Sequence, residues 1–256
     1  MIGLQATHEA DLIGHSGPVW EISWSHPKLG NLLASCGYDK SVIIWQRQDP
    51  SSSTWHQMYQ AKGLHKASVN SLCWAPYELG LLLATASSDG ALSVLEYDQN
   101  TGNWETNKIE DAHPVGATSV SWCPVTQQQQ QRRIASGGCD STVKIWAYDE
   151  QSGQWVQEGP GLVGHTDWVR SVAWAPAGGL SSSPCVASAG QDGKVVVWKQ
   201  EHGGSGSWNP VTVHTFGKAV WKASWSNNGG VLAVTDADQE VTMWKEVASG
   251  TWKQLP

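Results

Sequence analysis

The chain has 256 residues, of which 15% are charged, and its formal net charge is −7. Nucleic-acid-binding proteins usually carry clustered basic residues. The longest basic run here is Arg132-Arg133, so direct binding to nucleic acid is not expected. Neither a signal peptide nor an apolar run long enough to cross a membrane is present, which predicts a cytosolic or nuclear protein. The five cysteines lack metal-ligand spacing and are expected to be free thiols.

A repeated pattern of tryptophan and aspartate organises the chain. One tryptophan recurs in steps of 50, 48, 52 and 51 residues, at Trp24, Trp74, Trp122, Trp174 and Trp225. An aspartate follows each of them, at Asp39, Asp89, Asp140, Asp192 and Asp238. Six residues after each aspartate stand Trp45, Leu95, Trp146, Trp198 and Trp244. Repeats of this length built from strand-like segments are typical of a β-propeller.

The first repeat, taken in chain order, predicts four antiparallel strands. Residues 19–24 alternate apolar and polar side chains, as a half-buried strand does, whereas residues 32–36 are uniformly apolar or small, as in a fully buried strand. Asp39 lies in a tight turn. Residues 41–46 are β-branched and aromatic, and residues 54–60 form an outer strand after a polar loop. These strands make one propeller blade.

The same division predicts one all-β propeller domain over residues 1–256. Its five blades are residues 17–62, 66–112, 116–163, 167–216 and 218–256. Residues 1–13 match the outer strand of a further blade whose other strands are missing. We therefore expect an open ring with two unpaired margins, a situation that invites strand addition by another chain. Closure of the short ring on itself is the alternative, since propellers have as few as about four blades.

A polar set accompanies the repeat. A His precedes the first tryptophan and a Ser or Thr precedes the aspartate, which yields the sets His15, Ser35, Asp39 and Trp45; His65, Thr85 and Asp89; His113, Ser136, Asp140 and Trp146; and His165, Ser188, Asp192 and Trp198. The fifth repeat keeps only Asp238 and Trp244. Such a set can form a buried chain of hydrogen bonds. Because a catalytic triad occurs once and this set recurs, we interpret the sets as structural tetrads. No catalytic, metal or cofactor site is expected.

Several motifs carry a family resemblance. The starts Gly14-His15 and Gly164-His165, the Asp-led turns and the closing tryptophans resemble the WD-repeat family, although no closing Trp is followed by Asp. More specific segments are residues 17–20 (GPVW), 136–140 (SGGCD) and 167–170 (DWVR). They are similar to the SEC thirteen family, the small WD-repeat subunit of the COPII outer coat, with the plant or green-algal type nearest. The similarity runs from about Leu12 to Trp252.

The resemblance implies an open six-bladed propeller that is closed by a blade inserted from a larger partner. In the COPII coat that partner is the large cage subunit, and in the Y-complex of the nuclear pore it is a helical nucleoporin. The implied role is a non-enzymatic scaffold for ER-to-Golgi transport, on the cytosolic face of ER exit sites and COPII vesicles and at the nuclear envelope. Contact with a membrane would be indirect, through the coat. Relative to the family, most of the first blade is absent here. Residues 5–13 and 241–244 are then what remains of the site that would receive the inserted blade.

A second interpretation is a general WD-repeat adaptor that binds a peptide on its top face, the end of the central channel where the first strands begin. Trp20, Arg170 and Trp221 occupy broadly equivalent positions near those strand starts, and Trp168 lies beside Arg170 in sequence. These four residues are the candidate top-face binding site.

Overall fold

Five antiparallel sheets contain all the strands in the described part of the chain. The structure is a computed structural model, and it describes residues 7–49, 53–126, 130–177, 184–200 and 207–256. Blade one consists of β1 (Val19–Trp24), β2 (Leu32–Gly37), β3 (Val42–Arg47) and β4 (Trp55–Ala61). Blade two consists of β5 (Val69–Trp74), β6 (Leu82–Ser87), β7 (Leu92–Asp98) and β8 (Asn103–Ile109).

The remaining blades repeat this order. Blade three contains β9 (Ala117–Trp122), β10 (Arg133–Gly138), β11 (Thr142–Asp149), β12 (Gln154–Gln157) and a short β13 (Leu162–Val163) that also pairs with β11. Blade four contains β14 (Val169–Trp174), β15 (Cys185–Gly190), β16 (Lys194–Gln200) and β17 (Trp208–Thr215). Blade five contains β18 (Val220–Trp225), β19 (Leu232–Asp236), β20 (Val241–Ala248) and β21 (Thr251–Gln254).

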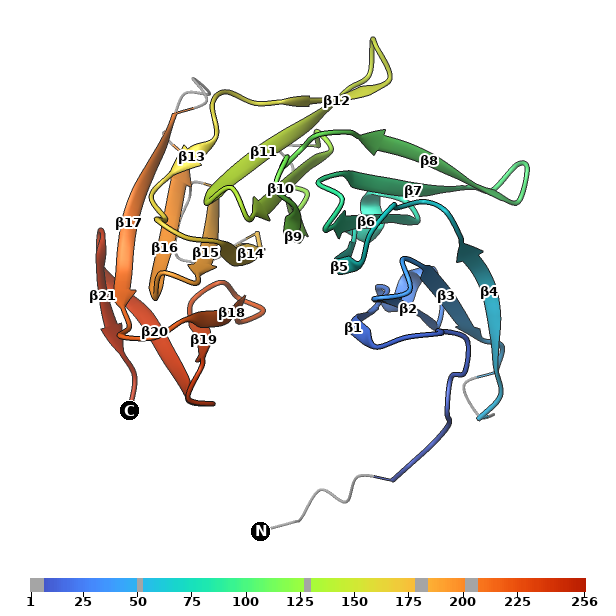
Figure 1. Cartoon of the computed structure of the whole chain (residues 1–256), viewed down its shortest axis with the longest axis horizontal. Coiled ribbons are helices and arrows are strands. Elements are labelled where there is room, and N and C mark those ends of the chain that lie inside the picture. The colour runs from blue at the N-terminus through green and yellow to red at the C-terminus, as the bar shows by residue number, and fades with distance from the viewer. Residues whose placement is uncertain (1–6, 50–52, 127–129, 178–183, 201–206) are drawn as a thin grey trace.

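The sheets stand around a common axis as the blades of an open propeller (Figure 1). The opening lies between blade one, in blue, and blade five, in red, and the C-terminus lies on that side. The four-stranded blades and the all-β fold predicted from the sequence are confirmed. The described helices are two short 3₁₀ turns, η1 (Pro27–Leu29) and η2 (Tyr77–Leu79). Neither has the length or apolar character needed to span a bilayer.

The prediction of a leftover outer strand was wrong for residues 7–13, which form no strand. Residues 1–6 lie outside the described part of the chain. A strand needs a hydrogen-bonded neighbour, and no described strand pairs with this segment. It lies instead against blade one, where Leu12 packs on Leu33, Ile43 and Trp45. Glu9 also forms an ion pair with Arg47 (Oε1 to Nη2, 2.6 Å).

The core lies between the blades, where the face of one sheet packs on the next. We call the face toward the preceding blade the leading face and the opposite one the trailing face. Ala34, Val42 and Ile44 on the trailing face of blade one are buried against Leu72 and Trp74 of blade two. The other seams between neighbouring blades have equivalent clusters.

Hydrogen bonds from the inner strands reinforce these seams. The indole Nε1–H of Trp74 donates to the Ser23 carbonyl at 3.0 Å, and that of Trp122 donates to the Cys73 carbonyl at 2.9 Å. Trp225 makes the same contact with Ala173 at 3.0 Å. Each of these three tryptophans therefore joins its blade to the inner strand of the preceding blade by a hydrogen bond.

A second seam bond joins a side chain at the third position of an inner strand to an amide in the next blade. The hydroxyl oxygens of Ser71, Ser119 and Ser171 accept from the amides of Val120, Val172 and Ala223 at 3.3, 3.1 and 3.3 Å. In blade one a glutamate takes this place, and the Leu72 amide donates to Glu21 Oε2 at 2.9 Å.

Substitution of Trp122 by Phe tests the indole bond directly. A smaller aromatic ring remains, but the Cys73 carbonyl loses its donor, so we expect the free energy of unfolding to fall by about 1–2 kcal/mol beyond the loss of buried ring volume. Urea denaturation measures this change. Trp208→Phe is the matched control, because Trp208 is also buried and its Nε1–H has no hydrogen-bond partner in the described residues. Equal losses for the two variants would contradict the role of the seam bond.

Candidate docking edge

The sequence-predicted tetrads are formed within single blades. In blade one, His15 Nδ1 lies 3.0 Å from both carboxylate oxygens of Asp39, and His15 Nε2 lies 2.8 Å from Ser35 Oγ. Trp45 Nε1–H donates to the same Ser35 oxygen at 2.9 Å. The tetrad ties the segment before β1 to β2, β3 and the turn between them.

Blades three and four contain the same network. His113 Nδ1 lies 2.9 Å from Asp140 Oδ1 and its Nε2 lies 2.8 Å from Ser136 Oγ, which accepts from Trp146 at 2.9 Å. In blade four the matching distances are 3.0, 2.7 and 2.8 Å, for the pairs His165–Asp192, His165–Ser188 and Trp198–Ser188.

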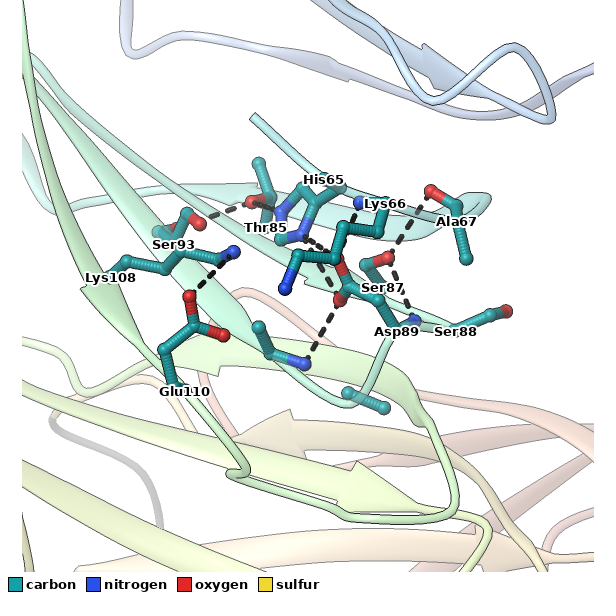
Figure 2. Close-up of polar contacts among 12 residues, drawn as sticks. His65, Lys66, Ala67, Thr85, Ser87, Ser88, Asp89, Ser93, Lys108 and Glu110 are labelled. Atoms are coloured by element: carbon teal, nitrogen blue, oxygen red, sulfur yellow. Dashed lines mark hydrogen bonds and ion pairs between the residues drawn. The ribbon is translucent and has the colours of Figure 1, made fainter. Parts of the chain in front are cut away.

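Blade two keeps three of the four groups (Figure 2). His65 Nε2 lies 2.9 Å from Thr85 Oγ1, and its Nδ1 lies 3.2 Å from Asp89 Oδ2. Where blades one, three and four supply an indole N–H, Leu95 is buried, and Thr85 Oγ1 also lies 3.3 Å from the Ser93 carbonyl oxygen.

Blade five has a different arrangement. The ring of Trp244 stacks on His214 at 4.8 Å between centroids, and its Nε1–H donates to Thr242 Oγ1 at 2.9 Å. Asp238 is exposed and pairs with Lys218 Nζ at 2.6 Å. Asp238 and Trp244 keep their spacing from the repeat, but they do not meet through a histidine.

The protonation states follow from burial and hydrogen bonding. Burial lowers the pKa of His65 and of His113 and outweighs the attraction of their aspartates, so both rings are neutral. Burial alone would raise the pKa of Asp39, but hydrogen bonds from the Ser16 amide, His15 and Ser41 more than offset it and lower the pKa to about 2. A neutral ring donates from Nδ1 to the carboxylate and accepts the hydroxyl proton at Nε2.

A nucleophile has to reach a substrate, and the hydroxyl-bearing residues of the tetrads do not. Ser35, Thr85, Ser136 and Ser188 are all buried, and three of them already accept from a tryptophan. This geometry favours a structural role. Among the described residues no His, Cys, Asp or Glu cluster has the geometry of a metal site, and the five cysteines are free.

Apolar side chains on the leading face of blade one are exposed, whereas the equivalent side chains of blade two are buried. Val19, Ile22 and Trp24 on β1 are 47%, 61% and 59% exposed. The residues at the same positions of β5 in blade two (Val69, Leu72 and Trp74) are buried. The difference arises because no described blade packs in front of β1.

The trailing face of blade five shows the same contrast. Val241 and Met243 on β20 are 64% and 51% exposed, whereas Val195 and Val197 at the same positions of β16 are fully buried. Together, Val19, Ile22, Trp24, Val241 and Met243 form what we call the docking edge. The strands that carry them, β1 and β20, lie on the two sides of the opening (Figure 1).

One ion pair crosses the opening. Lys222 Nζ on β18 contacts Glu21 Oε1 on β1. Both residues occupy the third position of an inner strand, where blades two, three and four have serine. This pair was not among the residues predicted from the sequence, although charged residues at a serine position of the repeat are a signal for it. Because Lys222 is more than half exposed, the pair adds little stability by itself.

The four candidate top-face residues are only partly brought together. Arg170 lies between two indoles, with its guanidinium carbon 4.8 Å from the ring centroid of Trp168 and 4.9 Å from that of Trp221. Trp20 donates from Nε1 to Ser68 Oγ of blade two at 2.8 Å.

The lowered pKa values of the buried histidines predict acid sensitivity. In the unfolded chain His65 and His113 take up protons near pH 6.5, whereas the folded protein holds both rings neutral to lower pH. The unfolded state therefore binds more protons, and the free energy of unfolding falls as the pH drops below about 6.5.

Urea denaturation between pH 7.5 and 5, roughly the range in which histidine titrates, measures the slope of the free energy of unfolding against pH. The double variant His65→Asn/His113→Asn should show a shallower slope, and an unchanged slope would rule out these residues as its source.

Comparison with known proteins agrees with this architecture. The model of the WD domain, G-beta repeat, matches residues 6–46, 104–147 and 157–199. "Protein SEC13 homolog" of Drosophila melanogaster is 45% identical over 258 residues, which cover 96% of this chain and 70% of the relative. "Protein transport protein sec13" of Emericella nidulans is 41% identical, with 95% and 82% covered, and that of Mycosarcoma maydis is 38% identical, with 98% and 82% covered. The chain therefore belongs to the SEC thirteen family of WD-repeat proteins.

Proposed function

We propose that this chain is a non-catalytic scaffold in protein transport, which acts in the COPII coat between the ER and the Golgi. Two of the relatives described above carry "protein transport" in their names, which supports the general role. The observation that carries the proposal is the docking edge, because apolar positions that are buried in the inner blades are exposed in the two end blades.

The edge fits a partner that contributes a sheet. Each inner seam buries apolar side chains from two sheet faces, and the docking edge offers two such faces without a described sheet between them. Full burial of one large apolar side chain contributes roughly 1.5–3 kcal/mol. A blade inserted into the opening would cover Met243 and Val241 in the way that blade five covers Val195 and Val197.

The partner in this proposal is the large cage subunit of the coat, which donates a blade. The same edge would accept a blade from a helical nucleoporin at the nuclear pore, so one surface would serve both assemblies. The chain would act on the cytosolic face of ER exit sites and COPII vesicles and at the nuclear envelope. It would touch membranes only through the coat.

A charge placed on the edge tests the proposal. The full chain is mixed with a fragment of the large cage subunit that carries its insertion strands, and complex formation is followed by size-exclusion chromatography and calorimetry. We expect a 1:1 complex that Met243→Lys weakens at least about tenfold, since a lysine would be buried without a partner. Val156→Lys on β12 is the matched control, because Val156 is similarly exposed but lies on blade three. The absence of any complex, or equal weakening by both variants, would refute the proposal.

A further inference from the structure

The structure places Arg170 at an unusual point of the repeat. The second residue of each inner strand interrupts the regular pairing with the neighbouring strand, which makes it a bulge position. A bulge turns its side chain out of the sheet. The five bulge residues are Trp20, Asn70, Thr118, Arg170 and Trp221.

Most bulge side chains form hydrogen bonds to the next blade. Asn70 Nδ2 donates to the Ala117 carbonyl of blade three at 2.8 Å, and Thr118 Oγ1 donates to the Val169 carbonyl of blade four at 2.5 Å. Arg170 has no such backbone contact in the described residues. Its Nε and Nη2 groups donate to Gln191 Oε1, at 3.0 and 2.7 Å, within its own blade.

The indoles of Trp168 and Trp221 hold the guanidinium from two sides. The two distances of 4.8 and 4.9 Å are within the range for cation–π contact. Trp221 belongs to β18, which packs beside β14 (Figure 1). Both indoles remain partly exposed, at 42% and 48%. Arg170 is partly buried, and its guanidinium is fixed in orientation by the two indoles and Gln191.

Arg170 differs from the other arginines in its electrostatic partner. The chain has four arginines, and three are matched by carboxylates: Arg47 by Glu9, Arg132 by Glu96 and Arg133 by Glu158. Arg170 meets the neutral amide of Gln191, and no carboxylate of the described ranges lies within ion-pair distance of it.

We propose that Trp168, Arg170 and Trp221 form a binding site for an acidic segment of a partner protein. Gln191 occupies one side of the guanidinium, and the N–H groups of Nη1 remain to receive an aspartate or glutamate carboxylate. Charge-assisted bonds of this kind are strong and directional. The partly exposed indoles supply apolar contact beside the charge, and tryptophan and arginine are enriched among the residues that contribute most to binding energy at protein interfaces. This site does not depend on the docking edge.

The test uses the full chain and a fluorescein-labelled oligoglutamate peptide that is blocked at both ends, with an oligoglutamine peptide of equal length as the ligand control. Binding is measured by fluorescence anisotropy. Because the protein is acidic overall, non-specific attraction of oligoglutamate is disfavoured. We expect oligoglutamate to bind, oligoglutamine not to bind, and Arg170→Gln to reduce affinity at least about tenfold.

Two further variants separate binding from folding. Arg132→Gln removes an arginine that also lies over an aromatic ring but is paired with Glu96, so it should leave affinity unchanged. Arg170→Lys keeps the charge and the contact with the indoles, so the melting temperature should be retained, but it loses the planar donor group and should still weaken binding several-fold. In ¹⁵N NMR spectra, oligoglutamate should shift the Nε–H signal of Arg170 and not that of Arg132. No binding of oligoglutamate, equal binding of both peptides, or equal effects of Arg170→Gln and Arg132→Gln would overturn the proposal.

Discussion

The seam between neighbouring inner strands is the interaction on which the rest of the structure depends. At this seam an indole donates to a carbonyl of the preceding blade, as Trp122 does to Cys73, and a serine accepts from an amide of the following blade, as Ser119 does from Val172. Apolar side chains of both sheets fill the space around these bonds. Because each seam joins one blade only to its neighbours, the stability of the ring is built up seam by seam.

The same rule explains the two ends of the ring. A blade with a neighbour on both sides buries both faces, and a blade with one neighbour exposes the other face. Trp24 and Met243 are exposed for this reason, and not because their sequences differ in kind from those of the inner blades. Lys222 of blade five has no next blade to join and pairs instead with Glu21, which still accepts from the Leu72 amide of blade two. The tetrads act within single blades, in blades one to four, so their contacts do not involve the opening.

The sequence predicted the elements that depend on local pattern. The strands of blade one differ from their predicted limits by at most one residue, since alternation and turn residues determine them. The candidate tetrad residues could be selected from spacing alone, because a fixed step from Asp to Trp requires a fixed turn between two strands. Residues 7–13 were wrongly predicted as a strand, since their sequence suits one but no described strand pairs with them. The stack of Trp168, Arg170 and Trp221 and the pair Glu21–Lys222 depend on contacts between different blades, which no local pattern contains.

In this account no blade packs against the leading face of blade one. Hydrogen exchange at single amides tests this most directly. The amides of Leu72, Val120, Val172 and Ala223 each donate to a side chain of the preceding blade, whereas the equivalent amide of Ile22 faces the opening. In ¹⁵N NMR spectra of the isolated chain, we expect the Ile22 amide to exchange with deuterium much faster than these four. Equal protection of Ile22 would show that the ring closes on itself and would contradict this account.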